Sequence, residues 1–410
     1  MADSSTNSKS KTGWGLEWWY NAHFSFGVIQ NVYIPILIPT FVLETTGTVG
    51  PAGIMMAIIG LGGLLAPVIG GLADKYRAHR WAQLGALLSY AIGGAVFAFA
   101  GDVMLLYYIA SGFFGIGSAT LLMINPAFIV AAGFSQDDEA VRLTRLNQTL
   151  IVGQLAAGLL LAALTSAGLS YELRFLTITA VALASLVLTA LTNKEAAERI
   201  KSGPAPGESG RSEQKAVGVK AMLFSVFGIF LLAVLFGQIA NTSLSGQFPN
   251  YMQQVFSIDP SMSSVTLSVS SIVTLIVLGM VGRWMAKSGP SPIWLTAMIM
   301  YLGTGGLLII LSSTFESVLP YLPLGLYVIY LQAMAWQDMV QPALAARASR
   351  GGAAITQGFL LFAVAGSYAF SSVLAADAAD AFGFGILAWI VVIGAGIAFV
   401  IGRTAIKKMT

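Results

Sequence analysis

A short charged stretch at residues 70–80 reads Gly70-Gly71-Leu72-Ala73-Asp74-Lys75-Tyr76-Arg77-Ala78-His79-Arg80. Residues 53–69 before it and residues 81–100 after it contain no Asp, Glu, Lys or Arg. Each run approaches the ~20 residues that an α-helix needs to cross a bilayer. The stretch therefore predicts a tight turn between two membrane helices, and its Lys and Arg residues predict that the turn faces the cytoplasm.

The composition agrees with a chain that crosses the membrane many times. Of its 410 residues, 56% are hydrophobic and only 10% are charged, whereas about 25% are charged in a typical soluble protein. The formal net charge of +3 is spread along the chain and indicates no nucleic-acid partner. The sequence contains no cysteine and two histidines, His23 and His79, so we expect no disulfide, no metal site and no cofactor.

Hydropathy predicts twelve spans with short connections. The expected ranges are 18–43, 50–73, 81–101, 103–132, 148–168, 172–192, 221–250, 262–284, 292–312, 318–346, 352–376 and 381–403. Pro126 and Pro342 are expected to mark the ends of the fourth and tenth spans. With both termini inside, every Lys and Arg except Arg174 falls on the cytoplasmic side, which predicts a multi-pass protein of the cell (inner) membrane with cytoplasmic termini.

A polar segment divides the chain. Residues 193–220 contain a run rich in Gly, Pro and Ser from Ser202 to Gly210, which is typical of a linker. The predicted domains are an N-terminal six-helix bundle (1–192), a cytoplasmic linker (193–220) and a C-terminal six-helix bundle (221–410). A shift of 210 residues pairs Gly27 with Gly237 and Asn31 with Asn241, so the bundles are predicted to be distant repeats.

The 70–80 stretch resembles the loop motif of the major facilitator superfamily, G-x-L-a-D-[RK]-x-G-[RK]. Gly70, Asp74 and Lys75 match it, whereas Arg77 replaces the second glycine. Together with the twelve spans, the resemblance covers about residues 14–408 and implies an all-α membrane protein with twelve transmembrane helices in two six-helix pseudo-repeat bundles. It also implies a conformational latch at Gly70, Asp74 and Lys75, in which the acid holds the cytoplasmic ends of the two halves together.

Two further family motifs are incomplete. Ser111 stands where the fourth span of the family usually carries an Arg linked to proton coupling, and Gly115 and Gly117 complete that pattern. The fifth span has Gly153 and Gly158 but lacks the Gly-Pro pair of drug exporters. The resemblance therefore identifies the family and leaves the subfamily open.

Polar residues recur at helical spacing in spans one, four, seven and ten, which line the central path in this family. Such residues are costly in lipid unless they face a partner or a wet cavity. The predicted substrate path is Gln30, Asn31, Ser118, Asn125, Gln238, Asn241, Tyr327, Tyr330 and Gln337. The alternative is that these side chains bond neighbouring helices together, and we favour that alternative for Gln148, Gln154 and Gln357.

Asp338 is the one acid placed within a span and away from both ends. We predict that it couples transport to an ion or contacts a cation, with His23 as the second candidate. The alternative is a structural acceptor bonded to neighbouring amides. The aromatic residues Trp18 and Trp19 are expected to anchor the first span at the membrane interface, with Glu17 solvated among them.

These features predict a secondary-active transporter of a small organic solute that works by alternating access, and not an enzyme. The path lacks Lys and Arg, which favours a neutral or weakly cationic solute. We expect coupling to a proton in preference to sodium, and a monomer in the lipid bilayer. The alternatives are a drug or metabolite exporter of the same fold, a lipid flippase, or a non-transporting membrane scaffold.

Overall fold

The computed structural model describes residues 16–132, 134, 136–202, 219–314, 321–349 and 353–409. Within these ranges the chain is helical and contains no strand. Ten of the helical segments are long and apolar enough to cross a membrane, and a shorter apolar one spans Gly50–Leu65. The protein is an all-α membrane protein.

The helices follow the predicted order. In the first half of the chain they are η1 (Trp18–Tyr20), α1 (Asn21–Val28), η2 (Ile29–Tyr33), α2 (Ile34–Thr46), α3 (Gly50–Leu61), η3 (Gly62–Leu65), α4 (Ala66–Lys75), α5 (His79–Phe99), α6 (Met104–Val130), α7 (Gln136–Ser166), α8 (Tyr171–Thr192) and α9 (Lys194–Ser202). In the second half they are α10 (Val219–Leu223), α11 (Val226–Ser245), α12 (Phe248–Phe256), α13 (Pro260–Ser288), α14 (Pro290–Thr314), α15 (Leu322–Ala348), α16 (Ala353–Phe382) and α17 (Ile386–Lys407).

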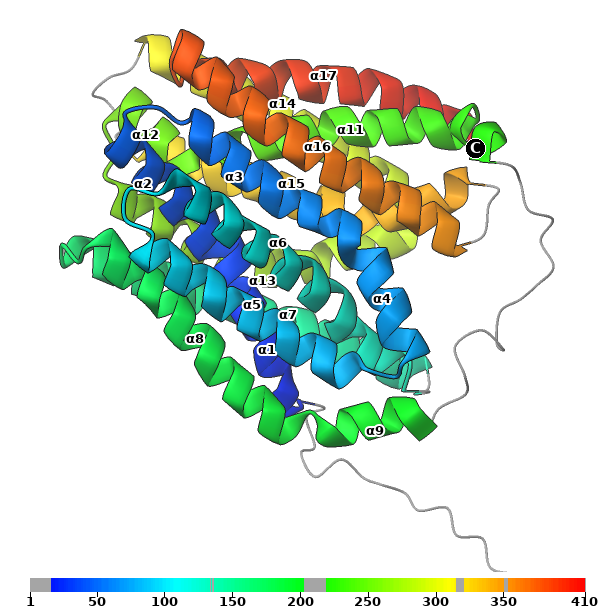
Figure 1. Ribbon diagram of the computed structural model, residues 1–410. Coiled ribbons are helices and arrows are strands. Elements are labelled where there is room, and N and C mark those ends of the chain that lie inside the picture. The colour runs from blue at the N-terminus through cyan, green and yellow to red at the C-terminus, as the bar shows by residue number, and fades with distance from the viewer. Residues whose placement is uncertain are drawn as a thin grey trace, which may run out of the picture.

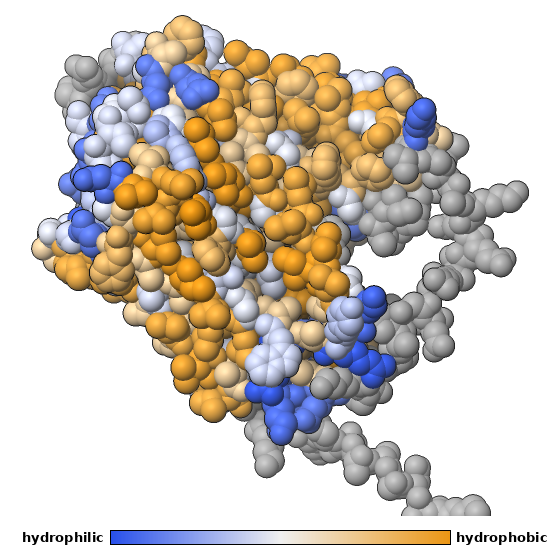
Figure 2. Space-filling view, in the orientation of Figure 1, coloured by the Kyte–Doolittle hydropathy of each residue, from blue (hydrophilic) through white to orange (hydrophobic). Residues whose placement is uncertain are grey.

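The bundle has two ends, which Figure 1 shows at opposite sides of the molecule. We call "linker end" the one that carries residues 76–78, α9 and the last turn of α17. We call "distal end" the one that carries residues 47–49 and the last turn of α16. In Figure 2 apolar residues cover the helices between these ends and hydrophilic residues gather near the ends, as expected for a protein embedded in a bilayer.

Two large buried clusters divide the core. One is built from residues 22–182, and the other from residues 222–406 together with Val49. The helices of the two chain halves meet along α3 with α16 and along α7 with α13, and the first pair lies side by side in Figure 1. This grouping supports the proposed division into two six-helix bundles.

Several predicted boundaries shift. Pro126 and Pro342 lie inside α6 and α15, so the prediction that they end these helices was wrong. In a membrane helix the backbone groups that a proline leaves unpaired can be satisfied by neighbouring helices and side chains. The seventh span is interrupted at residues 246–247, between α11 and α12. The first span continues but contains a π-helical turn, η2, with one more residue per hydrogen-bonded ring than an α-helix.

The turn at residues 76–78 has the conformation that the sequence motif implies. Arg77 has φ of 49°, in the left-handed region that favours glycine. Glycine is the residue that the family motif carries at this position, so the backbone shape is kept although the residue is not. Gly70 lies close to α6, because a Cβ atom there would be 2.5 Å from the Met123 sulfur. Asp74 and Lys75 form the last turn of α4.

Candidate functional site

A cavity of about 630 Å³ lies between the two chain halves. Its lining comes from α2, η2, α6 and α7 on one side and from α11, α12, α13, α15 and α16 on the other. Predicted path residues in the lining are Gln30, Asn31, Gln238, Asn241 and Tyr327, and the predicted coupling residue Asp338 is there as well. The structure thus brings residues from spans one, seven and ten to one cavity.

The π turn of the first span places two successive amides at the cavity. Gln30 and Asn31 are neighbours in sequence and both line it. On a regular α-helix successive side chains point about 100° apart, so the wider turn helps both to reach the same space. The Oε1 atom of Gln30 is buried and accepts no hydrogen bond from the described residues. It would accept a hydrogen bond from a solute only after the side chain turns toward the cavity.

Gln238 on α11 organises the opposite wall. Its Nε2 donates to Oδ1 of Asp338 at 3.2 Å and to Oε1 of Gln341 at 3.4 Å. Its Oε1 accepts from Nδ2 of Asn241 at 3.1 Å. These bonds leave Oδ1 of Asn241 and Nε2 of Gln341 buried without a partner among the described residues. The wall therefore contains one acceptor and one donor that have no partner among the described residues.

Asp338 lies on α15 among these amides. It is far from both ends of its helix, yet its side chain is exposed to the cavity. It is the only Asp, Glu, Lys, Arg or His among the described residues that line the cavity. An ionised carboxylate in such a place needs a cation or several hydrogen-bond donors, or it takes up a proton and becomes neutral. Among the described residues, the side chain that donates to Asp338 is Gln238.

Aromatic rings close one wall of the cavity. Tyr327 stacks on Phe248 with ring centroids 3.4 Å apart and an interplanar angle of 6°. Tyr330 stacks in turn on Tyr327 at 5.3 Å. The hydroxyl of Tyr330 donates to the carbonyl of Ala240 at 2.7 Å and also contacts that of Asn241. Tyr330 is thus fixed behind Tyr327, which itself lines the cavity.

Four predicted path residues lie outside the cavity lining in this conformation: Ser118, Asn125, Tyr330 and Gln337. Gln337 has no exposed surface and neither amide atom of its side chain has a partner among the described residues. Asn125 is fully buried within the first half. From its helix, α6, only Leu122 lines the cavity. The fourth span, α6, thus contributes less to the cavity than its polar stripe predicted.

Asn125 belongs instead to a chain of buried polar groups. It accepts from Nε2 of Gln83 at 2.8 Å, and its Nδ2 lies 3.1 Å from Nδ1 of His23. Gln83 accepts from Asn193 at 3.0 Å, and Asn193 accepts from Nε of Arg80 at 3.1 Å. His23 lies in this chain, buried and outside the cavity lining. The chain connects the linker end with the interior of the first half.

The cavity also contains residues that the sequence assigned elsewhere. Gln154 and Gln357, which we expected to bond helices together, both line it. Gln357 does donate to the carbonyl of Pro342 at 3.2 Å, so it has both roles. Ser270, Ser271 and Thr274 of α13 line it too. The available signal was the dense run of Ser and Thr on one helix between residues 263 and 274.

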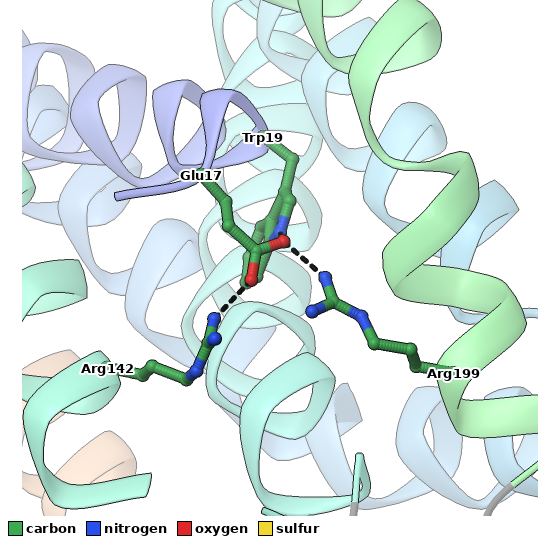
Figure 3. Close-up of polar contacts among 4 residues, drawn as sticks. All are labelled: Glu17, Trp19, Arg142 and Arg199. Atoms are coloured by element: carbon green, nitrogen blue, oxygen red, sulfur yellow. Dashed lines mark hydrogen bonds and ion pairs between the residues drawn. The ribbon is translucent and has the colours of Figure 1, made fainter. Parts of the chain in front are cut away.

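A second cluster of polar side chains joins α9 to the bundle at the linker end (Figure 3). Glu17 pairs with Arg142 of α7 through one carboxylate oxygen and with Arg199 of α9 through the other. Nε1 of Trp19 donates to Glu17 at 2.8 Å. Ala196 and Ile200 of α9 are buried beside Trp19. The expectation that Glu17 is solvated was wrong, because two arginines distant in sequence converge on it.

The electrostatics of this group favour the ionised carboxylate. Burial alone would raise the pKa of Glu17. The hydrogen bond and charge of Arg199, the hydrogen bond from Trp19 and the charge of Arg142 outweigh burial and hold the pKa below its usual value. Glu17 therefore stabilises the docked position of α9 as an anion.

Replacement of Glu17 by Gln is expected to lower the free energy of unfolding by about 1–3 kcal/mol, between the values for exposed pairs and for fully buried charges that lose a partner. The folded-state pKa is depressed, so the contribution is complete above the unfolded-state pKa and is lost as the pH falls through the folded value. Thermal unfolding in nanodiscs should show the two proteins converging as the pH falls below the unfolded-state Glu pKa of about 4.3. Glu195→Gln, which changes an exposed acid of α9, is the control, and an equal effect of both changes would contradict the assignment.

Comparison with known proteins identifies the family. The family model for the Major Facilitator Superfamily matches residues 20–376, and the chain belongs to this family. Similar solved structures include the D-xylose-proton symporter (TM-score 0.67, 14% identity, 95% of each chain covered). They also include a mutant of the nucleoside transporter NupG (0.71, 13%, 96% of this chain and 99% of that chain) and a mutant of the peptide transporter POT (0.74, 14%, 96% and 95%). A search of curated protein sequences finds no match.

The fold is therefore that of the major facilitator superfamily, as the 70–80 stretch and the spans predicted. The similar structures are transporters, and this fold class indicates a transporter in preference to an enzyme. At 13–14% identity the likeness establishes the fold alone.

Proposed function

We propose that the protein is a secondary-active transporter that moves a small organic solute by alternating access. The observation that carries this proposal is the cavity of about 630 Å³ between the two chain halves, lined by amides, hydroxyls and one carboxylate. This volume falls within the range of small-molecule sites, about 300–1,000 Å³. Nucleoside, D-xylose and peptide transporters share the fold.

The cavity lining supports a neutral or weakly cationic solute. Its described lining residues include Asp338 and no Lys or Arg, so a phosphate or polyanion would find no countercharge. Gln30, Asn241 and Gln341 offer unpartnered acceptor and donor atoms, which suit a solute that carries both kinds of group. We propose a proton, in preference to sodium, as the coupling ion at Asp338.

The test is a solute panel read first by binding and then by uptake. A solute at ~100 times its dissociation constant should raise the unfolding free energy by about 2.7 kcal/mol. Solutes that stabilise the purified protein are then tested for accumulation in proteoliposomes under an imposed proton gradient. Binding without transport in either direction would support the scaffold alternative, and outward accumulation would support the exporter.

Orientation is a second part of the proposal. The segregation of Lys and Arg in the sequence supports cytoplasmic termini and a cytoplasmic linker. We expect a reporter that is active only outside the cytoplasm to remain inactive when fused after Lys215 or at Thr410. A cytoplasm-only reporter at the same positions should be active. Activity of the first reporter at either position would refute the arrangement of twelve spans with cytoplasmic termini.

Three further assignments complete the proposal. The linker end would then face the cytoplasm, and the protein would lie in the cell (inner) membrane. Gly70, Asp74 and Lys75 would form the latch that holds the linker end closed in the conformation in which the distal end is open. The protein would act as a monomer of two six-helix bundles, residues 1–192 and 221–410, joined by residues 193–220.

A further inference from the structure

A carboxylate hydrogen-bonds the two chain halves to each other at the distal end. It belongs to the end of one helix and accepts from the first backbone N–H groups of another. Asp380, near the end of α16, accepts from the backbone N–H of Val49 through both oxygens, at 2.9 and 3.1 Å. It also accepts from the N–H of Gly50 at 2.8 Å. These donors begin α3, and the first N–H groups of a helix have no partner within it. The negative charge also interacts favourably with the positive end of the helix dipole.

We propose that Asp380 is the carboxylate that holds the distal end of the transporter closed and that it must release α3 when this end opens. The inference rests on the proposed alternating access, because it assigns one barrier of that cycle. Asp380 belongs to the second half of the chain and α3 to the first. The three hydrogen bonds are therefore available only when the distal ends of the two halves are together.

Apolar packing at the same point excludes water from the contact between the two halves. Val49 has no exposed surface and packs into the buried cluster of the second half, although it belongs to the first. Leu43 packs against the same cluster. Close by, Nδ2 of Asn250 on α12 donates to the carbonyl of Pro39 at 2.9 Å. Separation of the halves at this end would expose Val49 to water and break these bonds together.

Below the carboxylate, glycines let α3 and α16 approach closely. A Cβ atom at Gly53 would lie 2.5 Å from Cβ of Ala376 and 2.8 Å from the carbonyl oxygen of Ser372. One at Gly60 would lie 2.4 Å from the ring of Tyr368. Small residues of this kind permit close packing of membrane helices. The contact surface continues from Asp380 toward the cavity, whose lining includes Tyr368.

The position of Asp380 suits a reversible bond. Its side chain is exposed at the distal surface, beside a shallow pocket of about 470 Å³ that also contains Glu44. When the contact opens, water can therefore hydrogen-bond to the carboxylate and to the N–H groups of α3. Because hydrogen bonds are exchanged for others, the net contribution of such a contact is modest. A gate needs this property, since a bond too costly to break would arrest the cycle.

The absence of native cysteines allows a direct test. A single cysteine introduced at Met334, a half-buried cavity residue, is labelled with a membrane-impermeant maleimide added from either side. Labelling is normalised to the total obtained in SDS. Asp380→Asn keeps the size of the side chain but removes its charge and one acceptor. We expect it to raise the labelling rate from the distal side by about tenfold, in line with the loss of a charged hydrogen-bond acceptor.

Asp377→Asn is the matched control. Asp377 lies one turn earlier on α16 and is also an exposed acid near the start of α3, but the N–H groups of Val49 and Gly50 donate to Asp380 and not to Asp377. Its substitution should leave the distal labelling rate unchanged, and Asp380→Glu should retain more closure than Asp380→Asn. Thermal unfolding of each variant confirms that it is folded. Equal distal labelling in Asp380→Asn and the parent, or an equal increase in Asp377→Asn, would overturn the proposal.

The readout separates this inference from the proposed function. Labelling reports whether the distal end opens and requires no knowledge of the solute. Failure of the solute panel would therefore leave the labelling result valid. Conversely, distal labelling that is unchanged in Asp380→Asn would overturn the inference, while uptake could still establish transport.

Discussion

Replacement of Asp338 by Asn is expected to abolish gradient-driven accumulation while downhill exchange of solute continues. Asp338 is the only charged residue among the described residues of the cavity lining. Asparagine can still accept the hydrogen bond from Gln238 through Oδ1, so the local wall should persist. It can neither bind a proton nor balance a cation, and the solute should therefore only equilibrate across the membrane.

The measurement uses proteoliposomes with an imposed proton or sodium gradient and a solute from the panel. Accumulation should fall to the level seen without a gradient, while counterflow exchange remains. Asp377→Asn, which removes an acid from the distal surface outside the cavity, serves as the charge control. Unchanged accumulation in Asp338→Asn would rule out coupling at this residue. The same assay on His23→Gln then decides whether the buried chain through Asn125 contributes.

Replacement of Gly53 by Ala is expected to shift the protein strongly away from the closed distal end. The added Cβ would meet both a side-chain atom and a backbone oxygen of α16 at under 3 Å. Overpacking of this kind costs about 1–3 kcal/mol, which corresponds to a 5- to 150-fold change in the ratio of two conformations, roughly. Uptake should fall accordingly, because each cycle has to pass through the conformation described here.

Distal labelling of the cavity cysteine should rise in Gly53→Ala as it does in Asp380→Asn. Gly85→Ala provides the control, since a Cβ atom at Gly85 of α5 would meet nothing within 4 Å. That change should leave both labelling and uptake near the parent values. If Gly53→Ala labels and transports like the parent, α3 and α16 do not form a barrier at this depth.

The sequence predicted the family fold because its signals are local. Two uncharged runs on either side of residues 70–80 are sufficient to indicate a helical hairpin. Even the replaced glycine was informative, since Arg77 keeps a left-handed backbone. By contrast, the interruption at 246–247 and the π turn at 29–33 depend on what neighbouring helices supply to the freed backbone groups. The hydrophobic periodicity of one span does not show which helices will pack beside it.

The candidate site was predicted in part for a related reason. Helical spacing shows which residues share a face, and it correctly grouped Gln238 with Asn241. It does not show what that face meets. On α6, Asn125 meets Gln83 and His23 inside the first half, whereas Gln154 on α7 meets the cavity. Glu17 was misjudged because Arg142 and Arg199 are 125 and 182 residues away.

The two irregular turns described above lie at different depths along the path. The bond from Asn250 to the carbonyl of Pro39 sets parts of the seventh and first spans level with each other. By that alignment the break at 246–247 lies roughly five residues, or about 8 Å, nearer the distal end than the centre of the π turn, at 1.5 Å per residue. A solute that enters from the distal end therefore meets the break of the second half before the wide turn of the first. The two halves of the path are therefore not mirror images, so a solute meets the irregular turns in a different order from each side, while the imposed gradients alone decide the net direction of movement.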